Sequence, residues 1–183
     1  AVLRHRGLAL LGEQQGTVIA SDLLLRGNPT SDRAWDDGIL LVHGAVAELD
    51  RARIDRARGT PIYTLHSSTT LTARDLLVLP QESTGLILSY GTTSTLERLA
   101  VTNAHGFAIL VEGATARATF EDLVVADTVP SAGIEIARAL DVEEGSDVHV
   151  ARARFDSTTG FALTVVGATL SLEDVAVRGC KTD

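Results

Sequence analysis

The sequence has few aromatic residues, one cysteine and no methionine. Its 183 residues include one Trp, two Tyr, four Phe and two Asn, against sixteen Gly. The lone Cys180 excludes a disulfide scaffold within the chain. Lys181 is the only lysine and the formal net charge is −8, so the clustered cations that nucleic acids require are missing. No apolar run approaches the ~20 residues of a membrane span. With 45% hydrophobic residues the chain can still bury a core, and small and branched aliphatics indicate many short strands.

A six-residue pattern recurs seven times along the chain. It reads apolar, any residue, Asp or Arg, apolar, any residue, apolar, and successive copies begin 22–30 residues apart. Alternating apolar residues around it are typical of strands with one buried face. Each unit is too small to bury that face alone, so the repeat predicts stacked coils of strand, bend, strand and loop. The copies are residues 20–25, 49–54, 73–78, 96–101, 120–125, 150–155 and 172–177.

The repeat predicts an all-β fold, a right-handed parallel β-helix solenoid of about seven coils. Helical repeats fit poorly, because no stretch keeps apolar residues at helical spacing for three turns. Leucine-rich repeats fit poorly too, because the Asn or Cys expected after each last Leu is absent from most copies. Through the seven patterns and the glycines that follow them, residues 8–179 resemble the pectin-lyase-like β-helix architecture. That architecture hosts lyases, glycosidases, esterases, adhesins and non-catalytic surface proteins, so the resemblance implies a fold and no single activity.

Residues 1–183 are expected to form a single β-helix domain that is uncapped at both ends. The first eleven residues have no helical spacing, and the chain stops just after the last copy of the pattern. Uncapped coils expose apolar faces and strand edges. We therefore interpret the chain as a segment of a longer protein, with adjacent coils, capping segments or a second copy as partners, and Cys180 as a candidate for pairing outside the segment.

The third position of the pattern alternates in charge through all seven copies. Equivalent residues of a parallel β-helix stack on neighbouring strands about 4.8 Å apart, where opposite charges attract and like charges repel. We interpret this row, the charge ladder, as a structural feature that helps to set which coil sits on which. It comprises Asp22, Arg51, Asp75, Arg98, Asp122, Arg152 and Asp174.

Extra residues fall mainly between a pattern and the next glycine, in residues 26–37, 79–84 and 126–132. Each of these segments contains a proline, as loops should. They are predicted to emerge on one side of the solenoid, where repeat proteins often bind ligands. A further, acidic insertion is predicted at residues 140–147 in the other half of its coil.

The first loop contains the only tryptophan, Trp35, beside Asp32, Asp36 and Asp37. An exposed indole near carboxylates could stack on a sugar ring while the acids bind its hydroxyls or a Ca²⁺ ion. The alternative is a tryptophan that folds back onto the solenoid, with solvated acids around it. The sequence contains no complete calcium loop and no Cys/His metal spacing, so no other metal or cofactor is predicted.

A second candidate site precedes the glycine, or its equivalent, that ends each aliphatic strand. It comprises His43, His66, Tyr90 and Glu112, which would offer two bases, a phenol and an acid to a polysaccharide lyase or hydrolase. Ordinary surface side chains at strand ends are the alternative. Residues 103–106, Asn-Ala-His-Gly, are similar to the Gly-His-Gly of polygalacturonase-type hydrolases, but the accompanying signatures of that family are absent.

Arginines also cluster in and just after the second copy of the pattern. Because acids interleave the cluster, a solvated face is predicted there in preference to an anion site. The arginines are Arg51, Arg53, Arg56 and Arg58, and the acids are Asp50 and Asp55.

The sequence thus predicts a secreted or cell-surface β-helix module with a structural, adhesive or carbohydrate-binding role. The structural pattern recurs in all seven repeats. No set of residues with complementary catalytic chemistry stands out beside it. A polysaccharide-active enzyme of the pectin-lyase-like type and an end-to-end assembling filament subunit remain the alternatives. Carbohydrate is a candidate partner, and neither nucleic acid nor a membrane span is expected.

Overall fold

The computed structural model describes residues 2–5, 9–27, 38–80 and 82–181. Within these ranges every regular element is a β-strand, which confirms the all-β prediction. The described part of the chain has no helix of the length and apolarity needed to span a bilayer.

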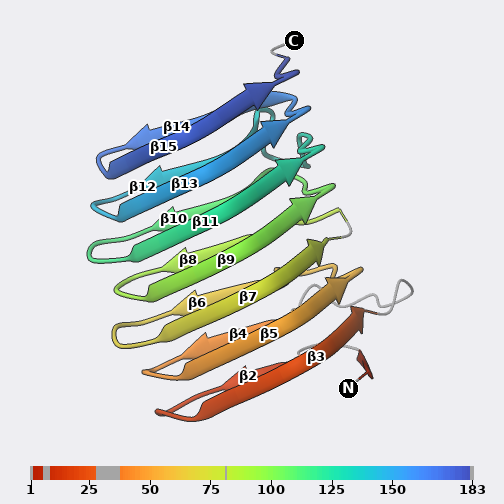
Figure 1. Ribbon diagram of the computed structural model, residues 1–183, viewed down its shortest axis with the longest axis vertical. Helices are drawn as coiled ribbons and strands as arrows, with labels where there is room; N and C mark the ends of the chain where they lie inside the picture. Colours follow the sequence, from red (N-terminus) through yellow and green to blue (C-terminus); the bar gives the residue numbers. More distant parts are fainter. Residues whose placement is uncertain (1, 6–8, 28–37, 81, 182–183) are drawn as a thin grey trace.

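Short and long strands alternate along the chain (Figure 1). Each short strand is followed by a tight turn and then by a long strand, whose end leads through a loop to the next short strand. The short strands are β2 (Leu10–Gly12), β4 (Ile39–Val42), β6 (Ile62–Leu65), β8 (Leu86–Ser89), β10 (Phe107–Glu112), β12 (Ala137–Glu143) and β14 (Gly160–Val166). The long strands are β3 (Thr17–Gly27), β5 (Val46–Asp55), β7 (Thr70–Leu79), β9 (Thr93–Thr102), β11 (Arg117–Ala126), β13 (Asp147–Asp156) and β15 (Thr169–Arg178).

The strands form two parallel sheets that face each other. The long strands and β1 (Val2–His5) make an eight-stranded sheet in the order β1-β3-β5-β7-β9-β11-β13-β15, and the short strands make a seven-stranded sheet from β2 to β14. One short and one long strand form a coil, so coil one is β2–β3 and coil seven is β14–β15. In Figure 1 the long strands run left to right in front and the short strands return behind while the chain climbs, which is a right-handed winding. The predicted seven-coil β-solenoid is therefore confirmed.

The core lies between the two sheets and is filled mainly by Leu, Ile, Val and Ala. Inward positions of neighbouring coils stack in register, as in the row Leu25, Ile54, Val78, Val101, Val125 and Phe155, all fully buried. Phe120 and Phe155 are the largest of the fully buried side chains. Such rows remove apolar surface from water along the whole axis, which is the main force that holds the coils together.

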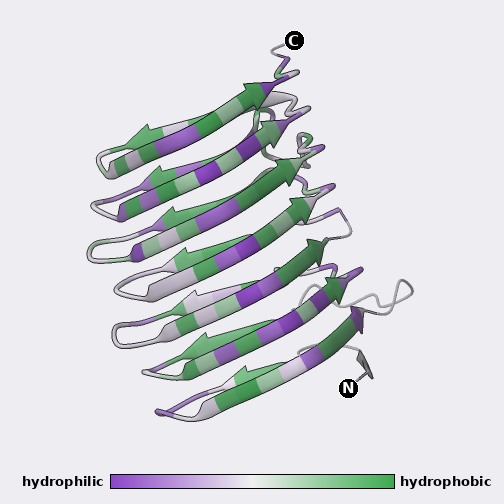
Figure 2. Cartoon of the chain, viewed as in Figure 1, coloured by the Kyte–Doolittle hydropathy of each residue, from purple (hydrophilic) through white to green (hydrophobic). Residues whose placement is uncertain are grey.

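Each long strand bends at its third pattern position. The charge-ladder residue in every coil has a positive φ, between 51° and 56°. In neighbouring long strands the residues on either side of the ladder position are paired in register, but the ladder residues themselves are not. Two consecutive residues then point outward, as Asp50 and Arg51 do between buried Leu49 and Ala52. The sequence predicts strand, bend and strand as separate elements. In the structure each long strand continues through the bend as a single element. Figure 2 shows hydrophilic segments stacked along the middle of the long strands.

The predicted acidic insertion at residues 140–147 is wrong. Leu140–Val142 belong to β12 and pair in register with residues 109–111 of β10. Leu140 and Val142 face the core, whereas Asp141 and Glu143 lie on the other face of the sheet. The extra length of this coil lies in the loop between β11 and β12, at residues 127–136.

Coil seven is exposed where coil six is covered. Inward-facing Val150 and Phe155 are fully buried, whereas Leu172 and Val177, their partners on β15, are 46% and 48% exposed. At the other end β1 pairs with residues 24–27 of β3, so that sheet edge is partly covered. No helix covers either end within the described ranges.

Candidate functional site

The charge ladder runs along the outside of the eight-stranded sheet. The guanidinium of each ladder arginine binds the carboxylate of the ladder aspartate in the coil before it. Each arginine also contacts an acidic neighbour, Asp50, Glu97 or Glu121 respectively. The pairs are Arg51–Asp22, Arg98–Asp75 and Arg152–Asp122, with Nε···Oδ1 distances of 2.7, 2.5 and 2.7 Å. Asp174 occupies the same position in coil seven.

These pairs are exposed, and their charges stabilise each other. The hydrogen bond from Arg51 and its positive charge lower the pKa of Asp22, and Arg98 and Arg152 lower the pKa of Asp75 and Asp122 in the same way. A shallow groove follows part of the row, between Ile19 and Arg98. The ladder arginines donate hydrogen bonds to carboxylates of neighbouring residues and of the preceding coil. The row therefore links coils to one another and has few donors left for a ligand.

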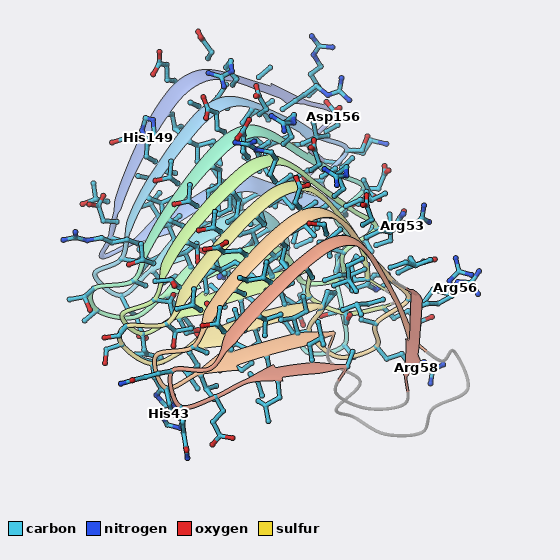
Figure 3. The ribbon with its side chains drawn as sticks, turned by 60° about the horizontal axis from the view of Figure 1, so that its bottom comes forward. His43, Arg53, Arg56, Arg58, His149 and Asp156 are labelled. Atoms are coloured by element: carbon cyan, nitrogen blue, oxygen red, sulfur yellow. The ribbon has the colours of Figure 1, made fainter. Side chains whose placement is uncertain are left out.

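The second predicted site lies at the turns between short and long strands. His43, His66 and Tyr90 occupy equivalent positions, each with a positive φ, just after β4, β6 and β8. The rings of His43 and His66 stack with centroids 4.1 Å apart and planes 12° from parallel. Figure 3 shows His43 at the turn, directed away from the core. Gln15, Ser67 and Ser68 complete a shallow surface hollow around the two imidazoles.

Glu112 does not belong to this row, so the predicted register is wrong at that position. Glu112 is the last residue of β10 and pairs with Ser89, while Gly113 takes the place equivalent to Tyr90. The Tyr90 ring covers Gly113 so closely that a Cβ there would lie 2.6 Å from the ring. Gly113, which follows β10, therefore aligns with Tyr90 and not with Gly91 of the preceding coil. The sequence pattern alone does not reveal this shift.

Glu112 instead joins a polar cluster on the outer face of the seven-stranded sheet. The Ser89 hydroxyl donates to Oε1 of Glu112 over 2.9 Å. On the next strand Nη1 of Arg138 donates to Oδ2 of Asp141 over 2.5 Å and to Oε1 of Glu143 over 3.2 Å. Register places Glu143 directly beside Glu112, since residues 111 and 142 are partners. We call these five side chains the sheet-face cluster.

The carboxylates of the sheet-face cluster are unequal. Asp141 is fully buried, although it lies on the outer face of the sheet, and Glu143 is partly exposed. Burial raises the pKa of Glu143, and so do the charge of Asp141, a hydrogen bond to Asp141 and the charge of Glu112. A proton on Glu143 allows its carboxyl to donate to Asp141. The cluster thus combines a carboxyl with a raised pKa, a buried carboxyl and a guanidinium.

Some polar atoms of the cluster are not satisfied by the part of the chain that the structure describes. Oδ1 of Asp141 and Nε of Arg138 are buried without a hydrogen-bond partner there. A buried polar atom without a hydrogen-bond partner costs stability, so each such atom calls for an explanation. Sequence reasoning missed this cluster because residues 140–147 read as an insertion, although alternation of Leu140 and Val142 with acids could have indicated a strand.

Two aromatic residues flank Arg138 of the sheet-face cluster, and two more lie farther along the same sheet. Arg138 lies over the Phe107 ring, with Cζ 5.3 Å from the centroid, and Phe161 pairs with Arg138 from the adjacent strand. Tyr63 lies on the same face of β6, and Tyr90 borders it at the turn after β8. Of the six Phe and Tyr residues, only Phe120 and Phe155 lie in the core.

The predicted sugar or Ca²⁺ site at Trp35, Asp32, Asp36 and Asp37 lies outside the described residues. Within the described ranges no group of three or more His, Cys, Asp or Glu side chains is arranged to hold a metal ion. Cys180 is exposed and free. The histidine of the 103–106 motif, His105, sits at an isolated bridge to Val129 beside a loop.

No protein-family model and no curated protein matches the chain. The functional argument therefore rests on the chain's own side chains.

Proposed function

We propose that the chain is a β-solenoid module of a secreted or cell-surface protein that binds a carbohydrate on the outer face of its seven-stranded sheet. The observation that carries the proposal is the position of Phe107 and Phe161 on either side of Arg138, in a chain with few aromatics. Flat apolar rings beside a few fixed polar groups are typical of small-ligand sites. The braced eight-stranded sheet supplies the rigid support.

Binding can be tested with immobilised neutral and uronate-containing oligosaccharides. Phe161→Ala should weaken capture, because this ring is 47% exposed and lies next to Arg138. Ile19→Ala is the matched control, since Ile19 is 72% exposed on the outer face of the other sheet. Equal capture by both variants and by the wild type would contradict the proposal.

A polysaccharide-active enzyme is the second candidate, favoured by the raised pKa of Glu143 beside Asp141 and Arg138. A carboxyl with a raised pKa beside ionised groups is the usual form of a general acid. Depolymerisation assays on neutral and uronate-containing polysaccharides test this candidate. Glu143→Gln should abolish any cleavage, whereas Glu144→Gln, an exposed neighbour on the turn, should not. Cleavage lost in the first variant alone would replace the binding-only proposal.

Assembly through coil seven is supported by the exposed Val165, Leu172 and Val177. Sedimentation of residues 1–183 at increasing concentration is the measurement for it. A constant monomeric coefficient would argue against a filament subunit.

A further inference from the structure

Three arginines converge on one carboxylate at the far end of the first two long strands. Nη2 of Arg26 lies 3.1 Å from Oδ2 of Asp55, Nη2 of Arg53 lies 3.6 Å from the same oxygen, and Nε of Arg56 lies 4.0 Å from Oδ1. Arg26 and Asp55 are register partners on β3 and β5. Figure 3 shows Arg53 and Arg56 on one side of the solenoid. We call these four residues the arginine patch.

The charges of the arginine patch do not balance. One carboxylate faces three guanidinium groups, which leaves a surplus of two positive charges in a chain of net charge −8. The Asp55 side chain is only 10% exposed, whereas those of Arg26, Arg53 and Arg56 are 40%, 48% and 58% exposed. A carboxylate accepts about four hydrogen bonds and each guanidinium carries about five N–H donors. Asp55 can therefore accept from only a minority of the donors of the patch.

The fourth arginine of the sequence cluster is used elsewhere. Arg51 belongs to the charge ladder and binds Asp22 and Asp50. The two acids of the sequence cluster are thus divided unevenly: Asp50 binds Arg51, and Asp55 is the one carboxylate among the described residues that contacts the patch arginines. In addition, Nε of Arg26 is buried with no hydrogen-bond partner in the described ranges. The three arginines are also exposed to solvent, as predicted for this face, so exposure and uneven pairing occur together.

Coil six provides the contrasting arrangement at the equivalent positions. Arg154 and Asp156 on β13 correspond to Arg53 and Asp55 on β5, and Nε of Arg154 binds Oδ2 of Asp156 over 2.6 Å, one to one. Between them, coils three to five carry uncharged residues in both rows: Leu77 and Leu79, Ala100 and Thr102, and Val124 and Ala126. Arg178 on β15 is the register partner of Asp156, so coils six and seven place two arginines beside one carboxylate, whereas coils one and two place three.

We propose that the arginine patch is a binding site for an oxyanion, that is, the carboxylate, sulfate or phosphate group of an acidic ligand. The planar guanidinium binds such groups through two parallel hydrogen bonds. Recognition by the patch should therefore depend on this geometry as well as on positive charge. Asp55 offsets part of the positive charge of the three arginines and so competes with an outside anion. Because the whole molecule is negative, attraction is short-ranged and local to the patch. The site lies on the eight-stranded sheet and does not depend on the carbohydrate proposal.

The test measures binding of inorganic sulfate, inorganic phosphate, polygalacturonate and heparin to the whole chain by calorimetry at low ionic strength. The four probes separate carboxylate, sulfate and phosphate sources. The double variant Arg53→Ala/Arg56→Ala should weaken the best probe about tenfold or more, which is the scale of lost charge-assisted hydrogen bonds. Arg154→Ala is the matched control, because it removes one neutralised arginine from the same row, and it should leave binding unchanged.

Two further variants separate shape from charge. Arg53→Lys/Arg56→Lys keeps both charges but loses the planar fork, so it should bind several-fold more weakly than the wild type at the same ionic strength. Asp55→Asn adds one net positive charge and should tighten binding, provided that circular dichroism shows the wild-type β-sheet signal. The proposal is overturned if no probe binds the wild type, if Arg154→Ala loses as much as the double alanine variant, or if the lysine variant binds as well as the wild type.

Discussion

The outer faces of the two sheets carry similar residue types in different states. On the eight-stranded sheet, the ladder aspartates Asp22, Asp75 and Asp122 each meet an arginine in an exposed pair, and the pKa of each is lowered. On the seven-stranded sheet one guanidinium, that of Arg138, serves two carboxylates, one of them fully buried. The pKa of the other, Glu143, is raised. Exposed one-to-one pairs connect neighbouring coils, whereas the crowded and partly buried cluster contains a carboxyl of raised pKa and polar atoms that a ligand can bind.

The largest expected effect follows from removing the guanidinium of the sheet-face cluster. Arg138→Ala leaves the buried Asp141 carboxylate without its cation and should destabilise the fold by about 3–5 kcal/mol, the cost of breaking a buried pair. Urea unfolding followed by circular dichroism measures the loss. Arg98→Ala on the ladder is the comparison, and its loss should be much smaller because both partners are exposed. Similar losses in the two variants would remove the distinction between the faces.

The second effect concerns Gly113, which lies under the Tyr90 ring at the turn after β10. Gly113→Ala forces a side chain onto a backbone with φ +88° and against the tyrosine ring, so it should cost about 1–3 kcal/mol. Gly133→Ala is the matched control, because Gly133 has φ +86° but nothing within 4 Å of the added Cβ. The difference between the two unfolding energies isolates the ring contact. Equal losses would show that Tyr90 moves away freely.

The third effect is a pH dependence of opposite sign on the two faces. A raised pKa means that folded Glu143 binds its proton more tightly than the unfolded chain, so its contribution is complete below about pH 4.3 and is lost as pH rises through the folded pKa. Glu143→Gln stays neutral, so its stability should rise relative to the wild type as pH increases. The ladder aspartates have lowered pKa values, so their contribution is present above about pH 3.9 and is lost as pH falls through the folded pKa.

Urea midpoints from about pH 3 to about pH 8 provide the measurement. Arg98→Gln should flatten the loss of stability on the acid side, and Glu143→Gln should flatten it on the neutral side. A wild-type to Glu143→Gln difference that is constant with pH would show that Glu143 titrates normally.

The smallest effect concerns the sign pattern of the ladder. Asp75→Arg places three arginines in a row and should lower the urea midpoint slightly but measurably. Adding Arg98→Asp restores the pair in reversed order, and both residue types already occur at this positive-φ position, so backbone strain is not introduced. Recovery of most of the loss would show that pairing within coils three and four matters. No recovery would show that strict alternation along all coils matters instead.

The repeat made the fold predictable to an unusual depth. Seven copies of one pattern specify which residues stack, so the ladder residues could be placed at equivalent positions before their contacts were known. The prediction missed that these residues bend the chain through a positive φ without ending the strand. It also placed Glu112 one position off, because a glycine follows the strand in several coils but occupies different turn positions. Where the coils differ in length, the pattern loses its register.

The candidate sites were less predictable because they depend on neighbours far apart in sequence. Nothing local to residues 138–143 shows that Ser89 and Glu112 lie beside them, since each belongs to another coil. The arginine cluster was visible in the sequence, but its division between the ladder and the patch was not. Arg26, which completes the patch, lies 29 positions before Asp55 and is not part of the sequence cluster.

The sequence by itself determined the solenoid, its number of coils and the sign of every ladder charge, because a period of alternating apolar residues can bury its face only by stacking. The tertiary structure alone decided which charges are neutralised. Burial and coil register assign Arg138 to a buried carboxylate and three arginines to Asp55. The interaction between two charges depends on the distance between them. For charges on different strands that distance is set by how the coils stack, which no single stretch of sequence specifies.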